Sequence, residues 1–216
     1  MSIQRLWRAA RWLSYTLGVV LFSFQPSAFA APIEPAAALS QARQNITNLV
    51  EVAPHFYRGA QPDYSGMKAL KDAGVQVDVC LVNDPHVIAS ESQDAQALGI
   101  RFVNIPLSPF KRPSDTDILR FLDIVNRKDD EPVFVHCQHG RDRTGAMVAI
   151  YREVHDHWTP DQAYQEMLNR GFRPFFKSLS DAVFDVGNQL GMLGHKPTVG
   201  FMATHFTGHN PALNPQ

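Results

Sequence analysis

The sequence predicts an α/β fold with a central, largely parallel sheet of four to five strands and helices on both faces. Short apolar or alternating segments, typical of strands, take turns along the chain with longer segments that begin at capping residues. Most of these helical segments end near a glycine. Strands connected through helices pair in parallel, and ligands bind at the carboxyl ends of such strands.

The first half of the predicted domain contains three strands and two helices. Each of these helices begins at a serine and ends at a glycine. In chain order the elements are a strand at 56–58 with a turn at 59–63, a helix from Ser65 to Gly74, an alternating strand at 75–82, a helix at 90–98 before Gly99, and a strand at 100–105 with a proline-rich loop at 106–113.

The second half continues the alternation around one polar loop. Its capping signals include a serine with an aspartate three residues later, and a threonine followed by proline and, at N3, glutamine. The elements are a helix capped by Ser114 with Asp117 at N3, a buried strand at 132–136, an amphipathic helix after Gly145, a helix from Thr159 to about Arg170, and a helix at about 180–193.

Residues 1–30 have the composition of a secretory signal peptide. Three arginines precede an uncharged, mostly apolar run at 12–24, and Ala28 and Ala30 follow at cleavage-site spacing. A short membrane anchor is the alternative, but polar residues interrupt the run, which is shorter than a comfortable span of about 20 residues. We therefore expect cleavage after Ala30, no stable membrane anchor afterwards, and a periplasmic or secreted protein.

The rest of the chain is expected to contain an alanine- and proline-rich linker at 31–45, one folded domain at 46–194 and a flexible tail at 195–216. Loss of residues 1–30 removes three arginines and no acidic residue, which leaves 17 basic and 21 acidic residues. This balance gives no indication of nucleic-acid binding. The length suits a single compact domain.

The segment His136 to Gly145, HCQHGRDRTG, is the most informative part of the chain. It lies between a predicted buried strand and a predicted helix, so backbone N–H groups and a helix N-terminus converge on it. Cys137 and Arg143 enclose five residues there. These dipoles and a nearby guanidinium stabilise a thiolate, which makes Cys137 a candidate nucleophile towards phosphorus.

The other residues of the loop have roles that fit this chemistry. Arg143 can present two parallel N–H donors to phosphate oxygens and stabilise transition-state charge. Thr144 places a hydroxyl beside the sulfur, Gly140 lets the backbone approach an anion closely, and His136 is expected to orient the loop by hydrogen bonding. The predicted substrate-binding residues are Gln138, His139, Gly140, Arg141 and Thr144.

Two other interpretations of these residues compete with a phosphate site. A structural thiol is the alternative for Cys137, but a turn this rich in charged and polar side chains makes a poor core. Zinc is the other alternative, but Cys137, His136 and His139 lack a second Cys or His pair at ligand spacing, so we expect no metal and no cofactor. Cys80, in the strand 75–82, is either a buried thiol or a partner of Cys137 in a reversible disulfide.

The loop resembles the signature of the cysteine-dependent protein tyrosine and dual-specificity phosphatases. The similarity covers most of 49–173, including FYRGAQP, VDVCLV, NIPLSP and YREVHDHWTPDQAYQEM, and is to exported bacterial dual-specificity phosphatases of the TpbA type. It implies a dual-specificity-phosphatase-like fold, a phosphocysteine at Cys137, a metal-free mechanism and phosphorylated protein as substrate. Arg58 would support the rim of the site or form a structural ion pair.

The resemblance also implies an aspartic acid that protonates the leaving oxygen from the loop after the preceding strand. Here that loop reads LSPFK at 107–111 and has no acid. Asp115 and Asp117 follow, but a helix N-terminus keeps such carboxylates ionised. Asp142 resembles the loop acid of myotubularin-type lipid phosphatases, where the nearby phosphate favours protonation. Asp142 is therefore the candidate acid ahead of Asp115, with a purely structural role as the alternative.

The sequence leaves three functions open. The first is a protein phosphatase acting on phosphotyrosine and also on phosphoserine or phosphothreonine. His139 and Arg141 add donors that also suit an inositol-phosphate or lipid-phosphate phosphatase. The third is a phosphate-binding module without turnover, which an aryl phosphate hydrolysis assay would exclude. A sulfurtransferase also uses a loop thiolate, but Arg143-Thr144 favours phosphate.

Overall fold

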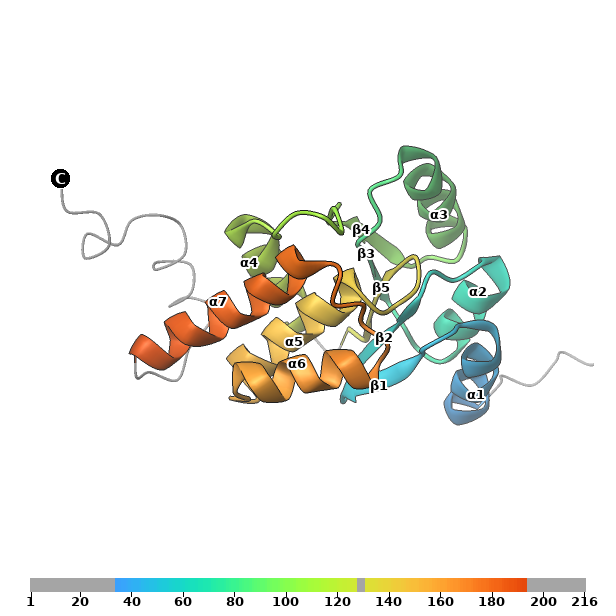
Figure 1. Cartoon of the computed structure of the whole chain (residues 1–216). Coiled ribbons are helices and arrows are strands. Elements are labelled where there is room, and N and C mark those ends of the chain that lie inside the picture. Colours follow the sequence, from blue (N-terminus) through green and yellow to red (C-terminus); the bar gives the residue numbers. More distant parts are fainter. Residues whose placement is uncertain (1–33, 128–130, 194–216) are drawn as a thin grey trace, which may run out of the picture. The chain divides into compact units, whose positions relative to one another are not determined.

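A computed structural model describes residues 34–127 and 131–193, and this part of the chain forms five strands and seven helices (Figure 1). The strands are β1 (Val50–Ala53), β2 (Phe56–Ala60), β3 (Val77–Cys80), β4 (Arg101–Asn104) and β5 (Val133–Cys137). The helices are α1 (Pro35–Asn45), α2 (Tyr64–Asp72), α3 (Pro85–Ala97), α4 (Asp115–Val125), α5 (Arg143–His155), α6 (Pro160–Asn169) and α7 (Lys177–Leu193). The predicted signal peptide at 1–30 and the predicted tail at 195–216 lie outside the described residues.

The sheet has the strand order β1-β2-β5-β3-β4, which places β5 at its centre. All neighbouring strands run parallel except β1, which is antiparallel to β2. Helices α1, α2 and α3 lie on one face of the sheet, and α4, α5, α6 and α7 lie on the other (Figure 1). The predicted fold class is confirmed. None of the described helices combines the length and hydropathy that a membrane span needs.

Two helices begin with the capping hydrogen bonds that the sequence predicted. At the start of α4, the Asp117 N–H donates to the Ser114 hydroxyl at 3.2 Å. At the start of α6, the Gln162 N–H donates to the Thr159 hydroxyl at 3.3 Å, and the Thr159 N–H donates to the Gln162 side chain at 2.9 Å. Each bond satisfies an N–H group that has no partner within its helix.

Three other helices begin earlier than the sequence indicated. Helix α2 is capped by Asp63 rather than Ser65, because the Asp63 carboxylate accepts a bond from the Gly66 N–H at 2.7 Å. Helix α3 begins at Pro85, after the cap Asp84, instead of near Ser90. Helix α7 begins at Lys177 instead of near residue 180. In α3 the proline stands at N1, where its missing N–H costs nothing.

The expected linker at 31–45 differs from the structure, in which residues 35–45 form α1. Ala38 and Ala42 of this helix are fully buried, and Ala42 shares a hydrophobic cluster with Ile46 and Leu70. The small alanine side chains let α1 pack closely against α2. The short edge strand β1 was also not expected from the sequence.

The central strand β5 directs alternate side chains to opposite faces of the sheet. Val135 and Cys137 belong to the hydrophobic core on the side of α4–α7, whereas Phe134 packs in the cluster on the side of α1 and α2. His136 shares the face of Phe134, and its register partner on β3 is Cys80. The two cysteines therefore lie on opposite faces and are free thiols, an arrangement that does not favour the disulfide considered above.

Candidate active site

The segment 136–145 connects β5 to α5 at the carboxyl edge of the sheet, as predicted. Gly140 has φ +67°, and a Cβ there would collide with the backbone of Gly59 and Ala60 on β2. A side chain at this position would therefore force the loop away from the sheet. The loop is also held by side chains, since Arg58 Nη2 donates to the Gly140 carbonyl and Asn48 Nδ2 donates to the His139 carbonyl, each at 3.0 Å.

Cys137 ends β5 with its side chain buried beneath this loop. Burial disfavours a thiolate, but hydrogen bonds from the hydroxyl and N–H of Thr144, the charge of Arg143 and the N–H of His139 outweigh it and lower the pKa of Cys137. Two backbone dipoles and one guanidinium thus converge on the sulfur. The local chemistry suits a nucleophilic thiolate.

Arg143 is the first residue of α5, and its guanidinium is anchored from one end. Nη1 donates to the Leu81 carbonyl at 3.3 Å, the Asn83 side chain at 3.1 Å and the Leu107 carbonyl at 3.2 Å. Nε and Nη2 make no such bond within the described part of the chain. An anchored guanidinium with two remaining donors has the geometry for bidentate binding of a phosphoryl group.

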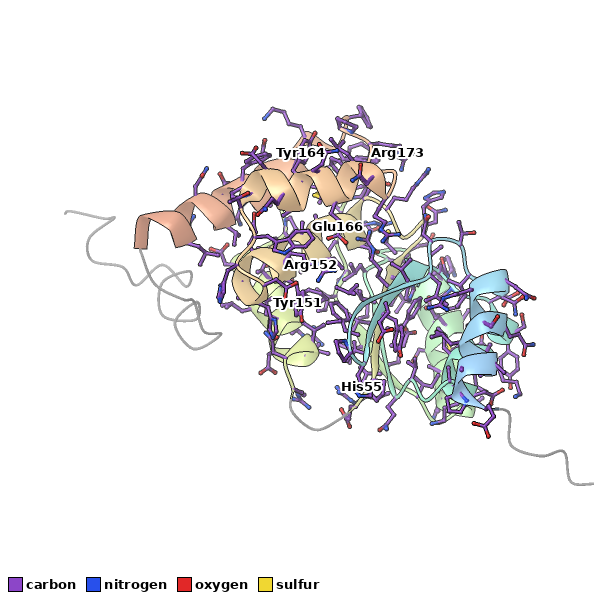
Figure 2. All side chains as sticks on the ribbon, turned by 90° about the horizontal axis from the view of Figure 1, so that it is seen from below. His55, Tyr151, Arg152, Tyr164, Glu166 and Arg173 are labelled. Atoms are coloured by element: carbon purple, nitrogen blue, oxygen red, sulfur yellow. The ribbon has the colours of Figure 1, made fainter. Side chains whose placement is uncertain are left out.

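Asp142 lies in the loop but is bonded to Arg173, in the connection between α6 and α7 (Figure 2). Its Oδ1 accepts bonds from the Arg173 N–H at 3.0 Å and Nε at 3.4 Å, and its Oδ2 accepts one from Nη2 at 2.8 Å. Asp115 is paired with Arg112 at 2.8 Å, and Asp117 accepts a bond from the Ser114 hydroxyl. Of the three candidate acids, Asp142 is the one within the loop itself, and it also ties this loop to the α6–α7 connection.

The remaining predicted substrate-binding residues lie on two sides of the loop. Thr144 is fully buried beside the sulfur of Cys137. On the outer side, a cavity of about 320 Å³ adjoins the loop. Its lining residues are Asn45, Thr47, Asn48, Ala60, Gln61, Gln138, His139 and Arg141.

Several residues that shape the site were not found from the sequence. Asn48, Asn83 and Arg173 are far from the loop in sequence, and Asn83 alone carried a signal, because it follows a strand at the binding edge of the sheet.

Arg58 is buried and bonded to the loop, and desolvation lowers its pKa to about 10, against the opposing effect of Glu166 on α6 (Figure 2). The sequence had assigned Arg58 a rim or ion-pair role.

His136 contacts two buried carboxylates on the face opposite Cys137. Its Nε2 lies 2.6 Å from Glu91 Oε1 and 3.2 Å from Asp78 Oδ1. Burial opposes protonation of the ring, but Asp78, Cys80 and Glu91 raise the pKa of His136 well above its usual value. These charged groups therefore support the start of the loop from the face of the sheet opposite Cys137.

Comparison with known proteins identifies the family. A family model described as a DSP-PTPase phosphatase fused to NAD+ kinase matches residues 29–178, more than half of the chain. The chain belongs to the DSP-PTPase phosphatase family. The family and the enzyme class that the sequence predicted are confirmed, since relatives and structural neighbours are cysteine-dependent phosphatases.

Two curated relatives show how far the likeness extends. The phosphatase is 32% identical over 171 residues to the dual specificity protein phosphatase TpbA of Pseudomonas aeruginosa strain UCBPP-PA14, covering 74% of this chain and 73% of TpbA. It is 27% identical over 111 residues to the inositol diphosphatase DSP1 of Oryza sativa subsp. japonica, covering 50% of each chain.

Solved structures agree with the family assignment. The crystal structure of P. aeruginosa TpbA matches with a TM-score of 0.55 at 26% identity, covering 69% of the phosphatase and 92% of TpbA. TpbA with a cysteine-to-serine substitution, in complex with phosphotyrosine, gives 0.54 at 26% identity, covering 79% and 99%. The catalytic core of the PP-IP phosphatase SIW14 from S. cerevisiae gives 0.53 at 18% identity, covering 68% and 94%, and shows the shared fold.

Proposed function

We propose that the phosphatase hydrolyses phosphomonoesters through a phosphocysteine at Cys137, with phosphotyrosine in proteins as its first substrate and phosphoserine and phosphothreonine as further ones. The observation that carries this proposal is the loop itself, where a buried sulfur with a lowered pKa lies beside the free donors of Arg143. The phosphotyrosine complex of the related TpbA supports the choice of substrate.

The reaction divides into two displacements at phosphorus. The Cys137 thiolate attacks while the bond from phosphorus to the leaving oxygen breaks, and Nε and Nη2 of Arg143 bind two phosphoryl oxygens as charge develops. Water then attacks the phosphocysteine, its proton passes to the Asp142 carboxylate, and the sulfur leaves as a thiolate. The Thr144 hydroxyl beside the sulfur stabilises that thiolate by hydrogen bonding.

Asp142 is the proposed donor of the proton to the leaving oxygen. Both of its oxygens are engaged by Arg173 in the structure, so donation requires Arg173 to move away first. The side chain of Arg173 is 47% exposed, which leaves it room to do so. If Arg173 stays, Asp142 instead fixes the loop, and leaving groups that need no proton are favoured.

An exposed aromatic edge beside the site supports an aryl substrate. Phe110 is 65% exposed and Phe175 is 75% exposed, and their rings meet edge to face at 5.9 Å. Phe110 lies three residues after Leu107, whose carbonyl accepts a bond from Arg143. Phe175 lies two residues after Arg173, which donates to Asp142 of the catalytic loop. Rings at this edge would pack against the ring of phosphotyrosine and add about 0.5–1.5 kcal/mol per aromatic pair.

A trapping experiment with Cys137→Ser tests the substrate. This variant, offered a mixed panel of phosphopeptides, inositol phosphates and phospholipids, should retain phosphotyrosine peptides. Phe110→Ala combined with Phe175→Ala should weaken that retention, while Tyr64→Ala, an exposed aromatic outside this edge, should leave it unchanged. Hydrolysis of an aryl phosphate by Cys137→Ser would contradict the mechanism itself.

An inositol-phosphate substrate is the second candidate, and the 320 Å³ cavity favours it. Gln138, His139 and Arg141 from the loop meet Asn48 and Gln61 there, so a second phosphate of a bound ligand would find several donors. The relation to a rice inositol diphosphatase also supports it. Retention of inositol phosphates alone in the trapping experiment would establish this class and contradict the first.

We further propose that the phosphatase is exported and acts in the periplasm or outside the cell. The support is the composition of residues 1–30, with three arginines, an apolar run and small residues at cleavage spacing. Mass analysis of the protein recovered from its host should find Ala31 at the N-terminus in the exported fraction. A cytoplasmic protein that retains residues 1–30 would contradict export.

A further inference from the structure

Four chemically reactive side chains meet on the face of the sheet opposite Cys137. They are Asp78 and Cys80 from β3, Glu91 from α3 and His136 from β5, and we call them the buried tetrad. None is more than 3% exposed. Side chains of this kind are rarely buried together unless each is paired or coordinates an ion.

Hydrogen bonding within the described part of the protein satisfies only one carboxylate oxygen of the buried tetrad, Glu91 Oε2, which accepts bonds from Gln61 at 3.3 Å and from the Cys80 thiol at 3.6 Å. His136 Nε2 lies 2.6 Å from Glu91 Oε1 and 3.2 Å from Asp78 Oδ1, and one ring nitrogen cannot donate well to both. Neither oxygen of Asp78 and neither ring nitrogen of His136 has a well-directed hydrogen bond within the described residues.

The charges of the buried tetrad are also unbalanced. Two carboxyl groups share the single imidazole of His136, burial raises the pKa of Glu91, and no lysine or arginine of the described chain pairs with Asp78 or Glu91. Arg58 and Arg143 are committed to the catalytic loop. A buried carboxylate without a full partner costs several kcal/mol, which a bound cation would offset.

We propose that the buried tetrad is a binding site for one Zn²⁺ ion. Cys80 Sγ, a Glu91 oxygen and a His136 nitrogen all lie within 4.8 Å of one another, and Asp78 Oδ1 points at the same nitrogen. Thiolate, imidazole and carboxylate ligands at bond lengths of about 2.0–2.3 Å form tetrahedral zinc sites. Binding replaces one proton on the Cys80 thiol and one on the His136 imidazolium.

The position of the site suggests a path of entry and a structural role. Gln61, which bonds Glu91, also lines the cavity beside the catalytic loop, so the ion would pass that side chain. His136 is joined directly to Cys137, yet the two side chains lie on opposite faces. The ion therefore anchors the start of the loop from the face opposite Cys137, with Cys80, Glu91 and His136 as its ligands and Asp78 next to the His136 nitrogen.

The zinc content of the purified protein tests the proposal independently of phosphatase activity. The full chain, produced with zinc in the medium, should contain about one zinc per molecule. The isosteric variants Cys80→Ser and Glu91→Gln should lose most of it. Cys137→Ser is the matched control and should retain it, because its sulfur lies on the other face. Folded, active protein without bound zinc would overturn the proposal.

Cobalt substitution identifies the ligand directly. Co²⁺ bound to the wild type should give a near-ultraviolet thiolate-to-cobalt charge-transfer band that persists in Cys137→Ser and disappears in Cys80→Ser. The reverse pattern would place the metal on the catalytic loop and overturn the assignment. A chelator should lower the Tm of the wild type, while Cys80→Ser, if folded by circular dichroism, should show no further decrease. An unchanged wild-type Tm after complete zinc removal would overturn the anchoring role.

Discussion

Glu153 offers a measurable link between burial and pH. It projects from α5 at 2% exposure, and neither carboxyl oxygen has a hydrogen-bond partner within the described residues. It faces Gly187 of α7, where an added Cβ would collide with Glu153 and with Pro160 at the start of α6. Desolvation raises its pKa from 4.5 to about 9. The folded protein therefore holds this proton at neutral pH, whereas the unfolded chain releases it.

The sign and size of the effect follow from linkage. A raised folded-state pKa means that the stability is fully present below pH 4.5 and is lost as pH rises through about 9. At 1.36 kcal/mol per pH unit, the loss is about 3 kcal/mol by pH 7 and approaches about 6 kcal/mol at pH 9. These values are a large share of a typical folding free energy of about 5–15 kcal/mol.

Glu153→Gln should remove this dependence, because the amide is neutral at every pH. Urea unfolding at several pH values between 5 and 9 should show the variant gaining on the wild type as pH rises. Glu51→Gln, at an exposed position, is the control and should follow the wild type. A difference between Glu153→Gln and the wild type that does not change with pH would refute the reasoning.

Three further changes test the loop. Asp142→Asn should lower kcat by about 10²–10⁴ for alkyl phosphates and much less for activated aryl phosphates if Asp142 is the general acid. An equal loss for all leaving groups, matched by Arg173→Ala, would show instead that their ion pair positions the loop. Arg58→Met should destabilise the fold by about 1.5–3 kcal/mol in urea unfolding, because the Gly140 carbonyl loses its charged donor; an unchanged midpoint would contradict this. Gly140→Ala should cost more than 1 kcal/mol and reduce kcat, since φ is positive and the backbone of Gly59 blocks a Cβ; full activity in steady-state assays would show that the loop tolerates displacement.

Local signals in the sequence predicted local structure well. The Thr159 to Gln162 box formed as expected because its two bonds join residues three apart. Helix α1 was missed because its contribution is tertiary: Ala38 and Ala42 look like linker residues until α2 lies against them. Strand β1 was missed for a similar reason, since its four residues are defined by pairing with β2.

The functional site likewise contains residues that local sequence predicted and residues that depend on contacts between distant parts of the chain. The spacing of Cys137 and Arg143 is local, so the nucleophile and the phosphate-binding guanidinium could be proposed from the chain alone. The bond from Arg173 to Asp142 joins residues 31 apart, and it requires the chain to pass through α5 and α6 and return to the loop. Nothing in the sequence near Asp142 indicates that partner.

The two faces of β5 explain why spacing along the chain drew attention to His136, Cys137 and His139 as metal ligands and not to Asp78, Cys80 and Glu91. Spacing around Cys137 tests for ligands that are close along the chain, and it found no second pair. In a parallel sheet, however, register brings distant residues together, and Cys80 stands beside His136 with 55 residues between them. Because side chains alternate, one short strand directs His136 to the buried tetrad and Cys137 to the catalytic loop. A ligand set assembled by register in this way is visible only once the strand order is known.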